Sequence, residues 1–118
     1  MERDLSDRLF NFASDVIKML RNIKYSQEAG IIKYQLTKSS TSSGANYEES
    51  QAASSKADFT NKISISLKEM RESNYWLRII KASEIYKSKK LDELITESGE
   101  LKNILGAIYT KARRKGKG

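Results

Sequence analysis

The chain has 118 residues, with 22 Lys or Arg against 15 Asp or Glu, and its net charge is +7. It contains no cysteine, histidine or proline, which excludes disulfides, thiolate metal sites and the commonest catalytic base. A chain of this length forms one domain with a single modest core. It has no apolar run near the ~20 residues of a membrane span and no signal-peptide pattern at its amino end, so we expect a cytoplasmic protein that contacts no membrane.

A seven-residue rhythm of apolar side chains predicts a first helix over residues 4–23. Its members are Leu5, Leu9, Phe12, Val16, Met19 and Ile23. Acidic residues lie near its amino end and basic residues near its carboxyl end, as the helix dipole favours. A short connection over residues 24–27 then reverses the chain.

The next segment, residues 28–54, permits two interpretations. It opens with an apolar turn that includes Ile31, Ile32 and Leu36, and then runs through five consecutive Ser or Thr residues to Gly44. Composition alone suggests a flexible linker. Alternatively, the small residues form a narrow helical stripe that lets a neighbouring helix approach closely. Helix propensity does not separate the two, because Ser, Thr, Asn and Gly are all mediocre helix formers.

Two further helices follow. Ser55 is placed to cap a third helix, with Asp58 three residues on, as in a capping box. A helical stripe then runs through Phe59, Ile63, Leu67, Met70, Asn74, Leu77 and Ile80. Residues 86–90 form a basic turn, and a fourth helix begins at Leu91, in which we expect Gly99 to loosen or break the helix. Four striped helices with short connections predict an all-α, antiparallel up-down-up-down four-helix bundle.

Three short motifs resemble a known family. They are T-S-x-x-A-N-x-x-E at residues 41–49, S-x-x-D-F-x-x-K-x-x-I at 55–65 and K-E-x-x-E-S-x-Y-W-L at 68–77. Together they resemble the bacterial four-helix-bundle proteins encoded by intervening sequences in large-subunit ribosomal RNA genes. The same fold includes the accessory protein of diversity-generating retroelements. The resemblance implies that residues 28–54 are one long helix, and that the bundle assembles as a ring-like homo-oligomer, typically a homopentamer.

Candidate subunit contacts follow from apolar surface beyond one core seam, which usually marks a partner. Phe10, Ile17, Ile65 and Ile79 add to that surface. We assign the oligomer interface to Asn46, Tyr75 and Trp76. Tyr75 and Trp76 permit a second interpretation, as a base-stacking platform beside Arg71, Arg78 and Lys81. Asn46 and Asn74 either set the helix register through buried hydrogen bonds or line a polar channel in the oligomer.

The positive charge points to an anionic partner, RNA or DNA. Five cations lie in the last eight residues, so we divide the chain into a bundle, residues 1–112, and a basic flexible tail, residues 113–118. The candidate nucleic-acid-binding residues are Arg71, Arg78, Lys81, Lys87, Lys89, Lys90, Lys111, Arg113, Arg114, Lys115 and Lys117.

No constellation points to catalysis, a cofactor or a metal. Di-iron bundles use Glu-x-x-His pairs, and this chain has no histidine. Glu69 and Glu72 share a helix face, but they alternate with Lys68 and Arg71, as in a solvated ion-pair face. The sequence therefore favours a non-enzymatic scaffold that contacts nucleic acid. The alternative is a protein–protein adaptor, for example one that holds a reverse transcriptase, with no direct nucleic-acid role.

Overall fold

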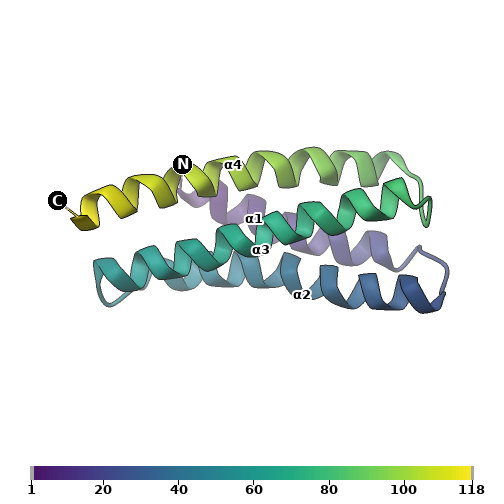
Figure 1. The fold of residues 1–118 in the computed structure, drawn as a ribbon, viewed down its shortest axis with the longest axis horizontal. Helices are drawn as coiled ribbons and strands as arrows, with labels where there is room; N and C mark the ends of the chain where they lie inside the picture. Colours follow the sequence, from purple (N-terminus) through teal and green to yellow (C-terminus); the bar gives the residue numbers. More distant parts are fainter. Residues whose placement is uncertain (1, 118) are drawn as a thin grey trace.

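The computed structural model describes the backbone of residues 2–117 and the side chains of residues 5–115. Within that range the chain forms four α-helices and no strand: α1 (Glu2–Leu20), α2 (Gln27–Ser50), α3 (Lys56–Ala82) and α4 (Lys89–Lys117). The helices lie side by side along the long axis of a body of 49 × 23 × 21 Å (Figure 1). The α1–α2 and α3–α4 connections lie at one end and the α2–α3 connection at the other. The predicted all-α fold with four helices is confirmed.

A serine hydroxyl marks the start of each of the last three helices. Ser26 Oγ accepts a hydrogen bond from the Ala29 N–H at 3.1 Å, Ser55 Oγ from the Asp58 N–H at 3.0 Å, and Ser88 Oγ from the Leu91 N–H at 3.0 Å. Each hydroxyl satisfies an N–H group that has no partner within its own helix. At α3 the carboxylate of Asp58 also accepts the Ser54 N–H at 3.2 Å. The predicted cap at Ser55 is therefore confirmed, whereas Asp58 accepts from the residue before the cap and not from the Ser55 N–H, as it would in a capping box.

The serine-rich segment is helical, as the family resemblance implies, and it lies within α2, which ends at Ser50, four residues before the predicted end at residue 54. Four of its serines are buried in the helix interfaces, and α3 and α4 contribute three more. They are Ser39, Ser40, Ser43 and Ser50 of α2, Ser66 and Ser73 of α3, and Ser98 of α4. All buried side-chain N and O atoms of the described residues have a hydrogen-bond partner. A buried hydroxyl costs free energy when it is unpaired, so complete pairing explains how α2 tolerates so polar a sequence.

The apolar core runs along the centre of all four helices. Every member of the predicted rhythm in the first helix is buried: Leu5, Leu9, Phe12, Val16, Met19 and Ile23. The helix itself ends at Leu20, three residues earlier than predicted. Ile23 still reaches the core from the connection, and its carbonyl accepts the Lys33 Nζ–H at 2.7 Å. Apolar periodicity thus identified the buried face more accurately than the helix end.

The fourth helix differs from the prediction in two respects. Gly99 neither loosens nor breaks it, because α4 is continuous from Lys89 to Lys117 and has no positive-φ glycine. The residues expected to form a flexible tail, from 113 on, continue this helix as far as Lys117. Their mobility in solution stays a prediction. Among the described helices, none is both long and apolar enough to cross a bilayer.

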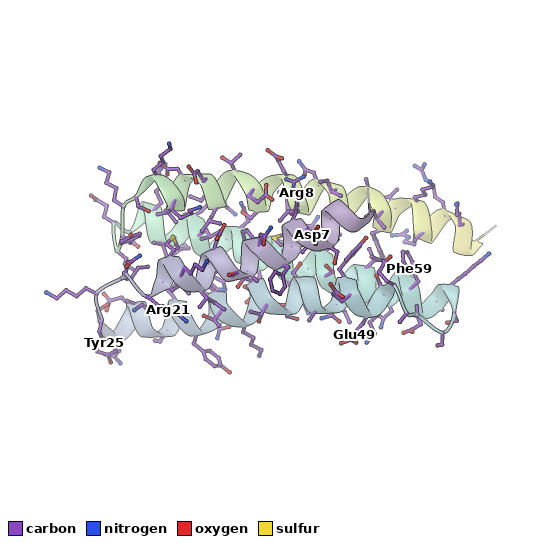
Figure 2. The ribbon with its side chains drawn as sticks, turned by 180° about the vertical axis from the view of Figure 1, so that it is seen from behind. Asp7, Arg8, Arg21, Tyr25, Glu49 and Phe59 are labelled. Atoms are coloured by element: carbon purple, nitrogen blue, oxygen red, sulfur yellow. The ribbon has the colours of Figure 1, made fainter. Side chains whose placement is uncertain are left out.

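An ion-pair cluster joins the first and last helices. Arg8 of α1 reaches α4, where its Nη2 lies 2.6 Å from Glu97 Oε1 and 3.0 Å from Glu100 Oε1 (Figure 2). Its Nε also donates to Glu97 Oε2 at 2.9 Å, so the contact with Glu97 is bidentate. The hydrogen bond to Glu97 raises the pKa of Arg8. This cluster links the side chains of α1 and α4.

Candidate nucleic-acid and protein interfaces

The predicted basic residues fall into two groups at opposite ends of the molecule. One group lies on the last turns of α4, and the other lies on the second half of α3, the α3–α4 connection and the first turn of α4 (Figure 1). Lys111, Arg113, Arg114 and Lys115 of the first group are all exposed. The side chain of Lys117 lies outside the described residues. A single continuous basic patch built from all the candidates is therefore not what the fold produces.

The two groups also differ in how far ion pairs neutralise their charge. In the α3–α4 group, Lys81 Nζ lies 2.8 Å from Asp92 Oδ1, and Lys90 Nζ lies 3.4 Å from Glu93 Oε1. Arg71, Lys87 and Lys89 are exposed. None of the ion pairs formed by the described residues involves a cation of the α4 group. The charge at the carboxyl end of α4 is thus the less neutralised of the two.

Asn74 connects α3 to α4. Its Nδ2 donates to Ser98 Oγ at 2.8 Å and to the Ile95 carbonyl at 3.3 Å, while its Oδ1 accepts from Arg78 Nε at 2.9 Å. This pairing supports the predicted role of Asn74 in setting the helix register. Asn46 is different, because its Nδ2 donates only within α2, to the carbonyl and the hydroxyl of Ser42. It is half-buried, and neither of these hydrogen bonds joins a neighbouring helix.

The adjacent aromatic residues of α3 have different environments. Trp76 packs against the core, and its Nε1–H donates to Glu72 Oε2 at 3.1 Å. Tyr75 is 48% exposed and meets Trp76 edge to face, with ring centroids 5.3 Å apart. The guanidinium of Arg78 lies 5.8 Å from the centre of the Tyr75 ring. One aromatic residue therefore supports the core, while its neighbour and an arginine form a small surface available to a partner.

A groove lies between α1 and α2, and the sequence did not indicate that its two sides come together. It has a volume of about 720 Å³. Leu9, Phe10, Ala13 and Ile17 of α1 line it on one side, and Thr41, Gly44 and Ala45 of α2 on the other. Phe10 is 71% exposed although it is a large apolar side chain. Phe10 and the stripe of small residues were each singled out in the sequence, but only helix packing shows that they face one groove.

Glu69 and Glu72 lie one turn apart on α3. Among the residues that the structure describes, no group of three or more Asp, Glu, His or Cys side chains could hold a metal ion. Burial, and then the negative charge of Glu72, raises the pKa of Glu69, while Lys68 and Lys38 lower it. Glu72 accepts the hydrogen bond from Trp76. Of this acidic pair, Glu72 therefore holds the indole of Trp76 by a hydrogen bond.

Sequence and structural comparisons identify the family. A family model described as "23S rRNA-intervening sequence protein" matches residues 2–107, which is most of the chain. The chain belongs to this family. The resemblance expected from the motifs at residues 41–77 is therefore confirmed, and the match extends over the flanking helices as well.

A solved structure agrees with this membership. The chain is similar to a protein of unknown function from the S23 ribosomal protein family of Bacteroides thetaiotaomicron, whose crystal structure was determined at 1.70 Å resolution. The two share 29% sequence identity over 92% of this chain and 97% of the other, with a TM-score of 0.83. No curated protein matches the chain.

The match to the family model covers some of the candidate surfaces and not others. The α1–α2 groove, Trp76 and the α3–α4 basic group all lie within residues 2–107. The basic carboxyl end of α4, from Lys111 on, lies beyond the match. Membership of the family therefore covers the bundle as far as residue 107, whereas a role for the α4 basic end depends on the chemistry of this chain.

Proposed function

We propose that this protein is a non-enzymatic scaffold that contacts RNA through its basic surface. Its subunit is an antiparallel up-down-up-down four-helix bundle, and the subunits assemble as a ring-like homo-oligomer, a pentamer. The observation that carries the RNA contact is the exposed cluster of Lys111, Arg113, Arg114 and Lys115, in which no side chain is engaged in an ion pair with the described residues. Such cations attract phosphate groups at long range.

The homo-oligomer part of the proposal is supported by unpartnered apolar surface. Phe10 is 71% exposed on the rim of the α1–α2 groove, and Tyr75 is 48% exposed beside Trp76. The groove places Phe10 beside Leu9, Ala13 and Ile17, and contiguous apolar surface of this kind commonly marks an interface. The small residues of α2, including Gly44 and Ala45, would let the helix of a second subunit approach closely.

The non-enzymatic part of the proposal is supported by the residue inventory. The chain has no histidine and no cysteine, and its buried serines donate or accept hydrogen bonds within the helix interfaces. A buried serine that is engaged in this way is not available as a nucleophile, which needs an accessible hydroxyl beside a base.

A protein–protein adaptor is the second candidate, and the α1–α2 groove is the observation that favours it. A groove of about 720 Å³ with an apolar floor can accept a helix of a different protein as readily as a second copy of this chain. In that case the basic end of α4 only maintains solubility, and the protein has no direct nucleic-acid role.

Salt-dependent RNA binding separates the two. Affinity of the full chain for a single-stranded RNA would be measured over a series of salt concentrations, beside a variant that lacks residues 111–118. The scaffold requires binding at low salt, and the deletion should lower the slope of log affinity against log salt by about 0.7 for each phosphate that the variant no longer binds. A full chain that shows no RNA binding at low salt would leave the adaptor as the better account.

A further inference from the structure

A second hollow lies where the start of α3 meets the end of α4, and it is lined mainly by polar and basic side chains. Its volume is about 830 Å³. Lys56, Thr60 and Asn61 line it from α3, and Tyr109, Arg113 and Lys115 line it from α4. These two segments are about 50 residues apart in the sequence, so only the fold brings their side chains together. We refer to this hollow as the α3–α4 groove. It includes the basic end of α4 and is distinct from the basic residues around the α3–α4 connection.

The charge of the α3–α4 groove is positive and unneutralised. Lys56, Arg113 and Lys115 are exposed, and none of the acidic side chains that the structure describes lines the groove. None of these cations forms an ion pair with a described residue. The nearest acid in the sequence, Asp58, accepts the backbone N–H of Ser54. The groove is therefore suited to an anion, and the exposed cations can each contact a separate phosphate.

An aromatic ring and a guanidinium group also line the α3–α4 groove. Tyr109 is half-buried and packs against the core, which holds its ring in place. The guanidinium carbon of Arg113, one helical turn further on, lies 5.9 Å from the centre of that ring. A smaller hollow of about 290 Å³ lies beside the first and is lined by Tyr109, Thr110, Arg113 and Arg114. The Tyr109–Arg113 pair thus lies on the boundary shared by the two hollows.

We propose that the α3–α4 groove is a binding site for single-stranded RNA. Lys56, Arg113 and Lys115 contact successive phosphates, and an unpaired base stacks against the Tyr109–Arg113 pair. Aromatic rings and guanidinium planes are the usual partners of unstacked bases. A duplex does not offer that contact, because its bases are stacked on one another, so the site favours a single strand. This inference rests on the proposed RNA-binding function and adds to it the residues and the strand preference.

The inference differs from a flexible basic tail in what it requires. A tail needs only charge, whereas the groove also needs Lys56, which lies at the start of α3 and far from the tail in sequence. It also needs the ring of Tyr109, which carries no charge. Substituting either residue therefore tests the groove without deleting the basic carboxyl end.

The experiment uses the full-length chain and three probes of equal length: oligo-uridine, an abasic ribose-phosphate strand and an RNA duplex. Two variants are compared with the unmodified protein: Lys56→Ala/Arg113→Ala/Lys115→Ala and Tyr109→Leu. A matched control, Lys24→Ala/Lys38→Ala/Lys68→Ala, removes the same number of charges from exposed positions that line neither groove. Thermal unfolding of every variant is recorded to confirm that the fold is retained.

The unmodified protein should bind oligo-uridine more tightly than the abasic strand or the duplex. The triple variant of the groove should lower the slope of log affinity against log salt by about 2, since each of the three phosphates that it no longer binds is worth about 0.7. Tyr109→Leu should leave that slope unchanged but weaken oligo-uridine binding about tenfold, which removes the preference over the abasic strand. The control should bind oligo-uridine much more tightly than the triple variant of the groove does.

Two results would overturn the inference while the proposed function stands. One is RNA binding that the groove variants and the control change equally, and the other is a duplex bound as tightly as the single strand. Absence of RNA binding by the unmodified protein at low salt would overturn the proposed function together with the inference. A Tyr109→Leu variant that fails to fold would leave the triple variant as the test, since its substituted side chains are exposed.

Discussion

Ser43 of α2 and Ser66 of α3 exchange a pair of hydrogen bonds across the helix interface. The hydroxyl of Ser43 donates to the carbonyl of Ser66 at 2.8 Å, and the hydroxyl of Ser66 donates to the carbonyl of Ser43 at 2.7 Å. Both side chains are fully buried. A side chain that reaches the backbone of the neighbouring helix requires the two helices to lie close together, so the size of serine matters here as much as its hydroxyl.

Substitutions at Ser43 should therefore be ranked by size. Ser43→Ala removes one buried hydrogen bond and should lower the free energy of unfolding by about 1 kcal/mol. Ser43→Leu should lower it further, by about 1–3 kcal/mol from overpacking in addition to the missing hydrogen bond, although leucine is the better helix former. Denaturant unfolding at one fixed protein concentration measures both. Thr96→Ala, at an exposed position of α4, is the control and should cause little change; a Leu variant as stable as the Ala variant would contradict the close approach.

Gly99 offers a stabilising substitution. It lies inside α4, and a Cβ atom placed there would meet no side chain or neighbouring helix within 4 Å. Gly99→Ala should raise the free energy of unfolding by up to about 1 kcal/mol, because glycine is unfavourable in a helix interior. Gly44→Ala should gain less, since its Cβ would lie 3.4 Å from Leu9 Cβ. A destabilised Gly99→Ala variant would show that the helix is not continuous at this position.

The assembly should be larger than a dimer. Light scattering at micromolar concentration should therefore give a mass more than twice the subunit mass of 13.4 kDa. Phe10→Asp should lower the mass without unfolding the subunit, because Phe10 is 71% exposed and contributes little to the core. Asn11→Asp, the exposed neighbour, is the control for added charge. Trp76→Ala should weaken the assembly or the core by several kcal/mol, since its ring packs against the core. A mass of 13.4 kDa for the unmodified protein would contradict the oligomer.

Glu69 should make stability depend on pH in an identifiable direction. Burial and the charge of Glu72 raise its pKa in the folded state, so the folded protein holds this proton more tightly than the unfolded chain does. Stability should therefore fall as the pH rises from the ordinary glutamate pKa of about 4.3 through the raised value, and the cost is complete above it. Glu69→Gln should remove that decline and should be slightly more stable than the unmodified protein at neutral pH. Unfolding measured as a function of pH is the test, and an identical pH profile for the variant would contradict it.

The sequence by itself determined the helices and their buried faces. The apolar rhythm from Leu5 to Ile23 and the stripe from Ile63 to Ile80 identified core residues, because the 3.6-residue period places them on one side of a helix. The Ser55 cap was likewise predictable, since the backbone N–H groups at a helix start need a nearby acceptor. The motifs at residues 41–77 also indicated the family. Propensity alone left residues 39–50 undecided, because serine forms helices only when its hydroxyl and its small size find a use in the packing.

The tertiary structure decided what lies opposite each polar side chain. Ser43 faces Ser66, Ser39 faces Ser73 at 2.8 Å between their Oγ atoms, and Asn74 faces Ser98. The candidate sites were decided in the same way. Lys56 and Arg113 share one groove, and Phe10 and Gly44 share another, although each pair is separated by more than 30 residues. Periodicity specifies the face of one helix at a time, whereas a groove depends on the register between two helices, which is set by packing and hydrogen bonds distributed along their whole length.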